Sequence, residues 1–269
     1  MKKSLFSCLP LALLLLLGCS KGGNTTPEAT EAMNTFVSVD AQERPRYLEI
    51  PIYTQKVTGQ TLRRKGYTTS YNRRTKQPDW VAWKLTAEHS RGEFRRDSMV
   101  FHEDPDVPDP RATDDDYFHS HYDRGHMCPS GDNKWSAEAQ EQSFLLTNVC
   151  PQNHTLNEKA WNDLEMQCRR WARKYGAVYI ACGPLFEGEN IKTIGKNKVS
   201  VPTGFFKVVL VNGRNPRAIG YIFENKASSQ GRICTVDEVE ALTGLDFFSL
   251  LNDDIEEKIE ATVTKSAWR

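Results

Sequence analysis

Three stretches of this chain are apolar at almost every position, and they limit its fold more than any other feature. They span residues 178–182, 205–211 and 218–223. A strand with one face in water alternates apolar and polar residues, so these runs predict strands that are covered on both faces. Two further strands are predicted at residues 80–85, after the turn signal Pro78-Asp79, and at residues 144–149.

Two helices are indicated between these strands. The first begins near Thr155, where Glu158 completes a capping-box pattern, and continues at helical spacing to a stop at Gly176. The second begins at Thr235 and ends at Gly244. The helices do not alternate regularly with the strands. We therefore predict an α+β fold, with a mixed, mainly antiparallel sheet flanked by helices.

The first residues are typical of an export signal rather than of the fold. Lys2 and Lys3 precede an apolar run, 11–17, that is too short to span a bilayer stably, and the run leads into Leu16-Leu17-Gly18-Cys19. These four residues resemble the lipobox of bacterial lipoproteins. The resemblance implies a signal peptide over 1–18 and acyl chains on Cys19. An ordinary signal peptide with a chance cysteine is the alternative.

The remaining chain divides by composition. Residues 19–44 are rich in small and polar residues and predict a lipidated tether; residues 45–260 form the predicted domain and 261–269 a tail. By the lipoprotein resemblance, Ser20 after Cys19 favours an exported protein held at the outer membrane, on its periplasmic or cell-surface face. Which face, and the oligomeric state, stay open.

Charge and cysteine content narrow the function classes. The whole chain has 35 basic and 35 acidic residues, so it lacks the global basic balance of a stoichiometric nucleic-acid binder. An enzyme that releases its product needs only a local basic cleft. Two disulfides and one free thiol are compatible with an oxidising compartment, but the sequence leaves the pairing open. The five cysteines after Cys19 are Cys128, Cys150, Cys168, Cys182 and Cys234.

One short segment collects the residue types of acid–base chemistry. It reads Tyr122-Asp123-Arg124-Gly125-His126-Met127-Cys128-Pro129. Asp123, Arg124 and His126 bring together a carboxylate, a cation and a candidate general base, and Gly125 permits a tight turn or the close approach of a ligand. A histidine here is as often an ordinary polar residue of a loop, so the motif alone leaves both interpretations open.

A second segment supplies oxygen ligands for a metal ion. It runs through Thr147-Asn148-Val149-Cys150-Pro151-Gln152 and on to Leu156-Asn157-Glu158-Lys159-Ala160-Trp161-Asn162-Asp163-Leu164-Glu165. On a regular helix Asn157 and Glu165 are about 80° apart around the axis, so both can border one cleft. Amide and carboxylate oxygens are hard donors that suit Mg²⁺. Taken singly, each residue is more often a solvated helical side chain.

Together the two segments resemble the DNA/RNA non-specific endonuclease family, whose catalytic unit is a ββα-metal motif. The resemblance extends from about residue 67 to about residue 250 and includes Pro78-Asp79-Trp80-Val81-Ala82-Trp83-Lys84-Leu85-Thr86 upstream. It implies an endonuclease that hydrolyses phosphodiester bonds of DNA and RNA. It further implies Mg²⁺ as the cofactor, with Mn²⁺ as a substitute.

The resemblance also assigns roles. His126 matches the general base that activates water, Asn157 the direct metal ligand, and Glu165 the acidic residue that holds water on the metal. Asn148 matches an amide that lines the site, and Arg124 the arginine beside the histidine. The family's upstream arginine, which stabilises charge on the phosphate, falls on either Arg95 or Arg96.

Two other functions are compatible with parts of the sequence. A zinc hydrolase would use His119, His121 and His126, but the helical spacing of the common zinc proteases is lacking. A non-catalytic nucleic-acid-binding lipoprotein could use the same fold after losing its catalytic residues. Every matched core position is present, which favours the enzyme.

Overall fold

The apolar runs pair into one seven-stranded sheet in which every neighbouring pair is antiparallel. The computed structural model describes residues 47–55 and 59–268; the predicted signal peptide, Cys19 and the tether lie outside them. The sheet order is β12 (Arg232–Cys234), β11 (Arg217–Glu224), β10 (Gly204–Val211), β7 (Ala177–Leu185), β4 (Gln77–Thr86), β3 (Thr68–Asn72) and β2 (Gln60–Arg63). The predicted α+β class is confirmed, and the sheet is wholly antiparallel rather than mixed.

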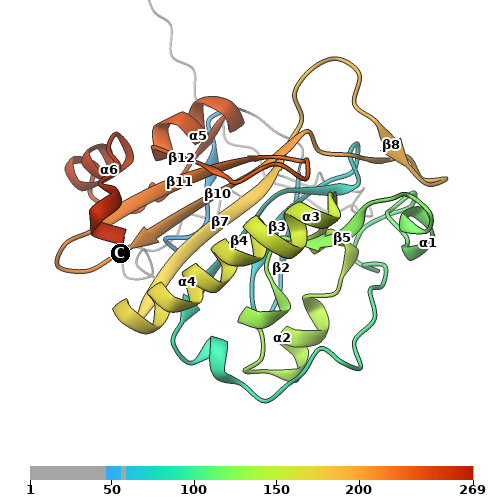
Figure 1. Ribbon diagram of the computed structural model, residues 1–269, viewed down its shortest axis with the longest axis horizontal. Coiled ribbons are helices and arrows are strands. Elements are labelled where there is room, and N and C mark those ends of the chain that lie inside the picture. Colours follow the sequence, from blue (N-terminus) through green and yellow to red (C-terminus); the bar gives the residue numbers. More distant parts are fainter. Residues whose placement is uncertain (1–46, 56–58, 269) are drawn as a thin grey trace, which may run out of the picture. The chain divides into compact units, whose positions relative to one another are not determined.

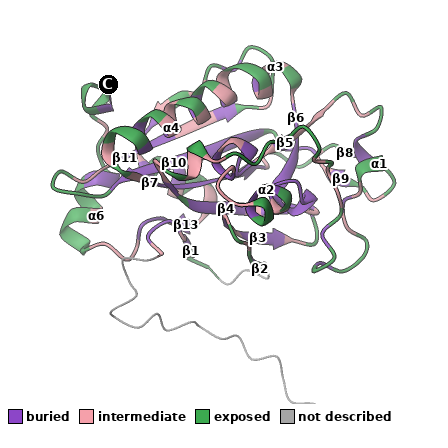
Figure 2. Ribbon diagram, turned by 90° about the horizontal axis from the view of Figure 1, so that it is seen from below, coloured by how far each residue is buried: buried purple, intermediate pink, exposed green. Residues whose placement is uncertain are grey.

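Helices cover both faces of this sheet, as the consecutive apolar positions predict. On β4, Val81, Trp83 and Leu85 pack in the core beneath α4 (Asn162–Tyr175). The alternate residues Trp80 and Ala82 pack in a second core with α5 (Val236–Thr243) and α6 (Asp253–Glu260). Figure 1 shows α4 running along the sheet beside β4 and β7, and Figure 2 shows buried strands between helices with exposed outer faces.

The predicted strand at 144–149 is wrong in its position. Residues Leu146–Asn148 form a 3₁₀ turn, η4, and the strand is β6 (Val149–Gln152), which pairs with β5 (Asp123–His126) outside the main sheet. The apolar character of Phe144 has another cause, because its ring packs against Phe101 and against His126. A buried loop can be as apolar as a strand.

Short elements complete the fold. The helices are α1 (Asp114–Tyr117), α2 (Ala137–Gln142) and α3 (His154–Leu156), with the π-helical segment η5 (Asn157–Trp161) between α3 and α4. The 3₁₀ turns are η2 (His89–Arg91), η3 (Ser130–Asp132) and η6 (Lys265–Trp268). The remaining strands form the pairs β1 (Ile52–Tyr53) with β13 (Leu245–Asp246), and β8 (Thr193–Ile194) with β9 (Val199–Ser200).

The segment assigned to a tail, 261–269, contributes to the core. Trp268 is buried, its ring lies against Trp171 of α4, and its carbonyl accepts a hydrogen bond of 3.0 Å from Trp171 Nε1. The chain after α6 therefore reaches the core beneath α4. Within the described residues, no helix is long and apolar enough to cross a membrane.

Candidate active site

The β5–β6 hairpin and the following helix frame the site. In the hairpin register Gly125 lies opposite Cys150, and His126 lies opposite Val149. A Cβ atom at Gly125 would come within 2.2 Å of Gln152 Oε1, so the glycine allows the Gln152 side chain to lie across the hairpin. This steric demand explains the glycine between Arg124 and His126 without any ligand.

The N-cap of the helix after the hairpin lies two residues before the predicted cap, Thr155. Asn153 is the N-cap, and its side-chain oxygen accepts a hydrogen bond from the Leu156 amide at 3.2 Å, so Thr155 lies inside the helix. The next five residues are π-helical and include Asn157 and Trp161. Trp161 Nε1 donates to the His126 carbonyl at 3.2 Å, which ties this segment to the end of β5.

A cleft of about 1350 Å³ opens between these elements. Of the sequence-predicted site residues, the structure brings Arg124, His126, Asn157 and Glu165 to its walls. Asn148 is not among the lining residues and is fully buried. Its Oδ1 accepts from the Cys128 amide at 2.9 Å, and its Nδ2 donates to the Cys128 and Ser143 carbonyls at 2.8 Å. Asn148 thus fixes the backbone just after His126 and does not face the cleft.

His126 is held among aromatic rings. The ring centroids of Phe101 and Phe144 lie 5.0 and 4.9 Å from the imidazole. Nε2 is buried and has no hydrogen-bond partner within the described residues. Burial disfavours the imidazolium and the charge of Arg96 opposes it further, so the pKa of His126 is lowered to about 3. The imidazole is therefore neutral at neutral pH, and it would accept a proton more readily once negative charge lies beside it.

A hydrogen bond sets the orientation of Asn157. Its Nδ2 donates to the Asp123 carboxylate at 2.8 Å, so the amide oxygen is the group left to act as an acceptor. The same carboxylate lies 3.0 Å from Nδ1 of His154, whose other ring nitrogen lies 3.2 Å from Glu158. Asp123 raises the pKa of the exposed His154 through this contact. Asp123 therefore orients Asn157 and forms no hydrogen bond with the His126 ring in the described chain.

Glu165 lines the cleft, and buried charged side chains lie close to it. Its side chain is 11% exposed, and burial raises its pKa to about 7 even though Lys207 and Arg169 favour the charged form. Arg169 is 4.0 Å from Glu165 and donates to Asp132 at 2.8 Å. Asp132 also accepts from Trp83 Nε1 at 3.0 Å, which anchors the group to β4.

The arginines differ in how far their charges are neutralised. Arg124 pairs with Asp114 through Nε and lies over the Tyr117 ring at 5.5 Å. Arg95 pairs with Asp97 at 2.8 Å on the exposed surface. Arg96 forms no ion pair among the described residues; it lies 5.8 Å from the Phe144 ring, and its charge acts on both His126 and Glu165. Both upstream arginines line the cleft, but Arg96 is the one without an ion pair among the described residues and the one whose charge acts on His126 and Glu165.

The structure does not assemble the histidine cluster of a zinc hydrolase. His119 and His121 are exposed and do not line the cleft with His126. Among the described residues, the one group placed to hold a metal through His, Cys, Asp or Glu contains carboxylates alone and lies elsewhere. All five described cysteines are buried free thiols, so neither disulfide that the sequence allows is present.

Two residues near the site were given no role from the sequence. Asp123 is recognised from the sequence only as a carboxylate of the motif, whereas the structure pairs it with Asn157, 34 positions away. Lys207 is fully buried in β10; its Nζ has no hydrogen-bond partner in the described chain and lies 3.9 Å from the centre of the Trp161 ring. A lysine within an otherwise apolar strand was the available signal, because burying a charge requires a compensating partner.

One cleft, framed by a hairpin and a helix, thus brings together an imidazole, amide and carboxylate oxygens and an arginine, which is a set of groups suited to phosphodiester hydrolysis. A family model described as DNA/RNA non-specific endonuclease matches residues 45–254. The chain therefore belongs to the DNA/RNA non-specific endonuclease family. It is a nuclease that acts on DNA and RNA, and the non-catalytic alternative is set aside. Nucleases of this family depend on a metal ion.

Individual relatives support this membership. Bovine mitochondrial endonuclease G is 35% identical over 216 residues, which are 74% of this chain and 72% of that protein. Nuclease C1 of Cunninghamella echinulata var. echinulata is 39% identical over 210 residues, 71% of this chain and 83% of that one. The chain spans 45% of zebrafish nuclease EXOG. A solved chain of an EndoG/EndoGI complex superposes with a TM-score of 0.71 at 28% identity, over 80% of this chain and 94% of that one.

The buried imidazole makes a pH prediction. In metal-free protein, His126 should stay neutral as the pH falls from 8 to 5, because its pKa is lowered to about 3, whereas an ordinary histidine becomes charged near 6.5. His154 is the internal control and should become charged above 6.5, since Asp123 raises its pKa. Imidazole ¹⁵N chemical shifts measure both. A His126 midpoint near 6.5 would contradict the described burial.

Proposed function

We propose that this protein cleaves phosphodiester bonds of DNA and RNA with Mg²⁺ as the cofactor and His126 as the general base. The observation that carries the proposal is the position of the His126 imidazole. Its Nε2 has no hydrogen-bond partner in the described part of the chain, and it shares one cleft with the oriented amide of Asn157. A proton acceptor and a metal-binding oxygen are thus held within one framework of β5, β6 and η5.

The donor set fits a hard divalent cation. Asn157 would hold the ion through Oδ1, because Nδ2 is committed to Asp123, and Glu165 would contribute a carboxylate on the next turns of the same helix. Oxygen donors with no thiolate or imidazole among them favour Mg²⁺, and Mn²⁺ tolerates the same set. When bound, the ion neutralises negative charge that develops on the phosphate.

The protein residues account for the proton and charge transfers. His126 takes a proton from water as the water oxygen bonds to phosphorus, and the bond from phosphorus to the leaving sugar oxygen breaks; that oxygen takes up a proton from solvent. The buried imidazolium formed in this step is offset by the negative charge on the phosphate. Arg96 supplies positive charge beside the same group, and Arg124, whose Nε pairs with Asp114, also lines the cleft.

The cleft chemistry supports broad specificity. Arginines and a metal ion bind phosphate oxygens, which carry no information about the base sequence. The cleft is only locally basic: Asp97 neutralises Arg95, and Glu158 and Asp123 face His154. The near-zero net charge of the chain therefore does not conflict with a nucleic-acid substrate.

The location of the enzyme is proposed from sequence alone. We infer an exported protein with a lipid on Cys19, held at the outer membrane on its periplasmic or cell-surface face. The motif Leu16-Leu17-Gly18-Cys19 supports this proposal. A Cys19→Ser protein should leave the membrane fraction, and retention of that variant in membranes would exclude the lipid anchor.

The cleavage chemistry is tested with supercoiled plasmid and total RNA, each incubated with Mg²⁺ or with EDTA. Wild-type protein should degrade both substrates only with Mg²⁺. The His126→Ala variant should lose about 10²- to 10⁴-fold in rate because the general base is removed. His119→Ala, an exposed histidine outside the cleft, is the matched control and should retain activity. Cleavage that survives EDTA or His126→Ala would overturn the mechanism.

A pair of arginine variants in the same assay compares an arginine without an ion pair in the described chain, Arg96, with an ion-paired arginine that lines the same cleft, Arg95. Arg96→Ala should lower kcat about 10²-fold, because the removed charge faces the reacting phosphate. Arg95→Ala, one residue away and paired with Asp97, should change kcat by less than about 3-fold. Equal losses from both variants would refute the assignment of the phosphate contact to Arg96.

A further inference from the structure

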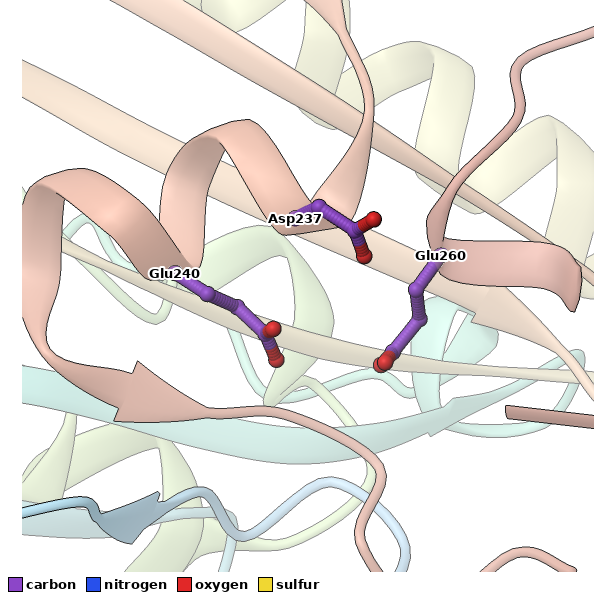
Figure 3. A group of neighbouring side chains, drawn as sticks. All are labelled: Asp237, Glu240 and Glu260. Atoms are coloured by element: carbon purple, nitrogen blue, oxygen red, sulfur yellow. The ribbon is translucent and has the colours of Figure 1, made fainter. Parts of the chain in front are cut away.

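Three carboxylates from two helices converge on the face of the sheet that α5 and α6 cover. Asp237 and Glu240 lie one turn apart on α5, and Glu260 is the last residue of α6. One oxygen from each lies within 4.8 Å of the others. Figure 3 shows the three side chains directed toward a common point between the helices. None of them lines the cleft that holds His126.

The innermost carboxylate lacks any compensation from the protein. Glu260 is 5% exposed, and its Oε1 is buried without a hydrogen-bond partner within the described residues. No lysine or arginine of the described chain forms an ion pair with Asp237, Glu240 or Glu260. Glu260 also stands at the C-terminal end of α6, where the helix dipole disfavours negative charge. A buried unpaired carboxylate of this kind is costly.

The surroundings add negative charge and hold one ligand in place. Glu240 Oε1 accepts from the Phe247 amide at 2.8 Å, so its second oxygen is the one left for another partner. Burial, followed by repulsion from Glu240, Glu256, Asp246 and Asp237, raises the pKa of Glu260 to about 9. The three carboxylates therefore repel one another unless a cation lies between them.

We propose that Asp237, Glu240 and Glu260 form a structural site for Ca²⁺. All three donors are carboxylate oxygens, which select a hard cation over zinc or copper. Ca²⁺ accepts irregular sets of carboxylates and waters, whereas Mg²⁺ demands a near-ideal octahedron. The ion would join α6 to α5 and would secure the segment that carries Trp268 to the core. The proposal is independent of the cleavage mechanism.

Thermal unfolding tests the site. The purified protein carries Asn157→Ala, so that metal in the active-site cleft does not contribute; it is stripped with EGTA and titrated with CaCl₂ or MgCl₂. Ca²⁺ should raise Tm in a saturable manner by about 5–10 °C at roughly a hundred times its Kd. Mg²⁺ should have a smaller effect.

Matched variants identify the ligands. Glu260→Gln should keep or raise the Tm of the calcium-free protein, because a buried charge is removed, and should abolish the shift caused by Ca²⁺. Asp237→Asn serves the same purpose at an exposed position if Glu260→Gln does not fold. Glu238→Gln, on the same helix but paired with Arg232, should retain the full shift. The absence of a Ca²⁺ shift, its persistence in Glu260→Gln, or a shift with Mg²⁺ alone would overturn the proposal.

Discussion

The hydrogen bond from Asn157 to Asp123 joins the two halves of the active site. Asp123 opens strand β5, which ends at His126, and Asn157 opens the π-helical segment that continues into α4 and Glu165. A bond between these residues fixes the hairpin against the helix and selects which end of the Asn157 amide can meet a ligand. The proposed base, His126, and the proposed metal-binding oxygen of Asn157 are therefore positioned by one contact. The Trp161 bond to the His126 carbonyl supports the same alignment.

Beneath this contact lies a buried polar layer that the hydrophobic core has to accommodate. Lys207 from β10 lies against the Trp161 ring, while Asp132 is held by Trp83 and Arg169. Burial disfavours the ionised form of Glu165 and Asp132 adds to this effect, whereas Lys207 and Arg169 favour the ionised form. The pKa of Glu165 is thus raised to about 7, close to neutral pH. Burying these charged groups lowers the free energy of unfolding. Because they act on Glu165, which lines the cleft, the packing of the sheet also affects the electrostatics of the site.

The sequence predicts those features that depend on local pattern. Consecutive apolar residues such as Phe205 and Phe206 identified a sheet covered on both faces, and Thr235 with Gly244 marked the ends of α5. Contacts between residues far apart in the chain could not be predicted from the sequence. Phe144 was assigned to a strand because it is apolar, but it is apolar because it packs against His126. No periodicity in the sequence indicates the π-helical segment that begins at Asn157. The choice between Arg95 and Arg96 depends on a surface pairing with Asp97, which only the folded chain defines.

The most direct test of this account is the metal dependence of cleavage by Asp123→Ala. If Asp123 orients Asn157, the Mg²⁺ concentration for half-maximal rate should rise about 10- to 100-fold, with much of kcat recovered at saturating metal. His154→Ala removes the other partner of Asp123 and should leave the metal dependence close to that of the wild type. An unchanged Mg²⁺ requirement in Asp123→Ala would contradict the account. A requirement shifted equally in His154→Ala would contradict it as well.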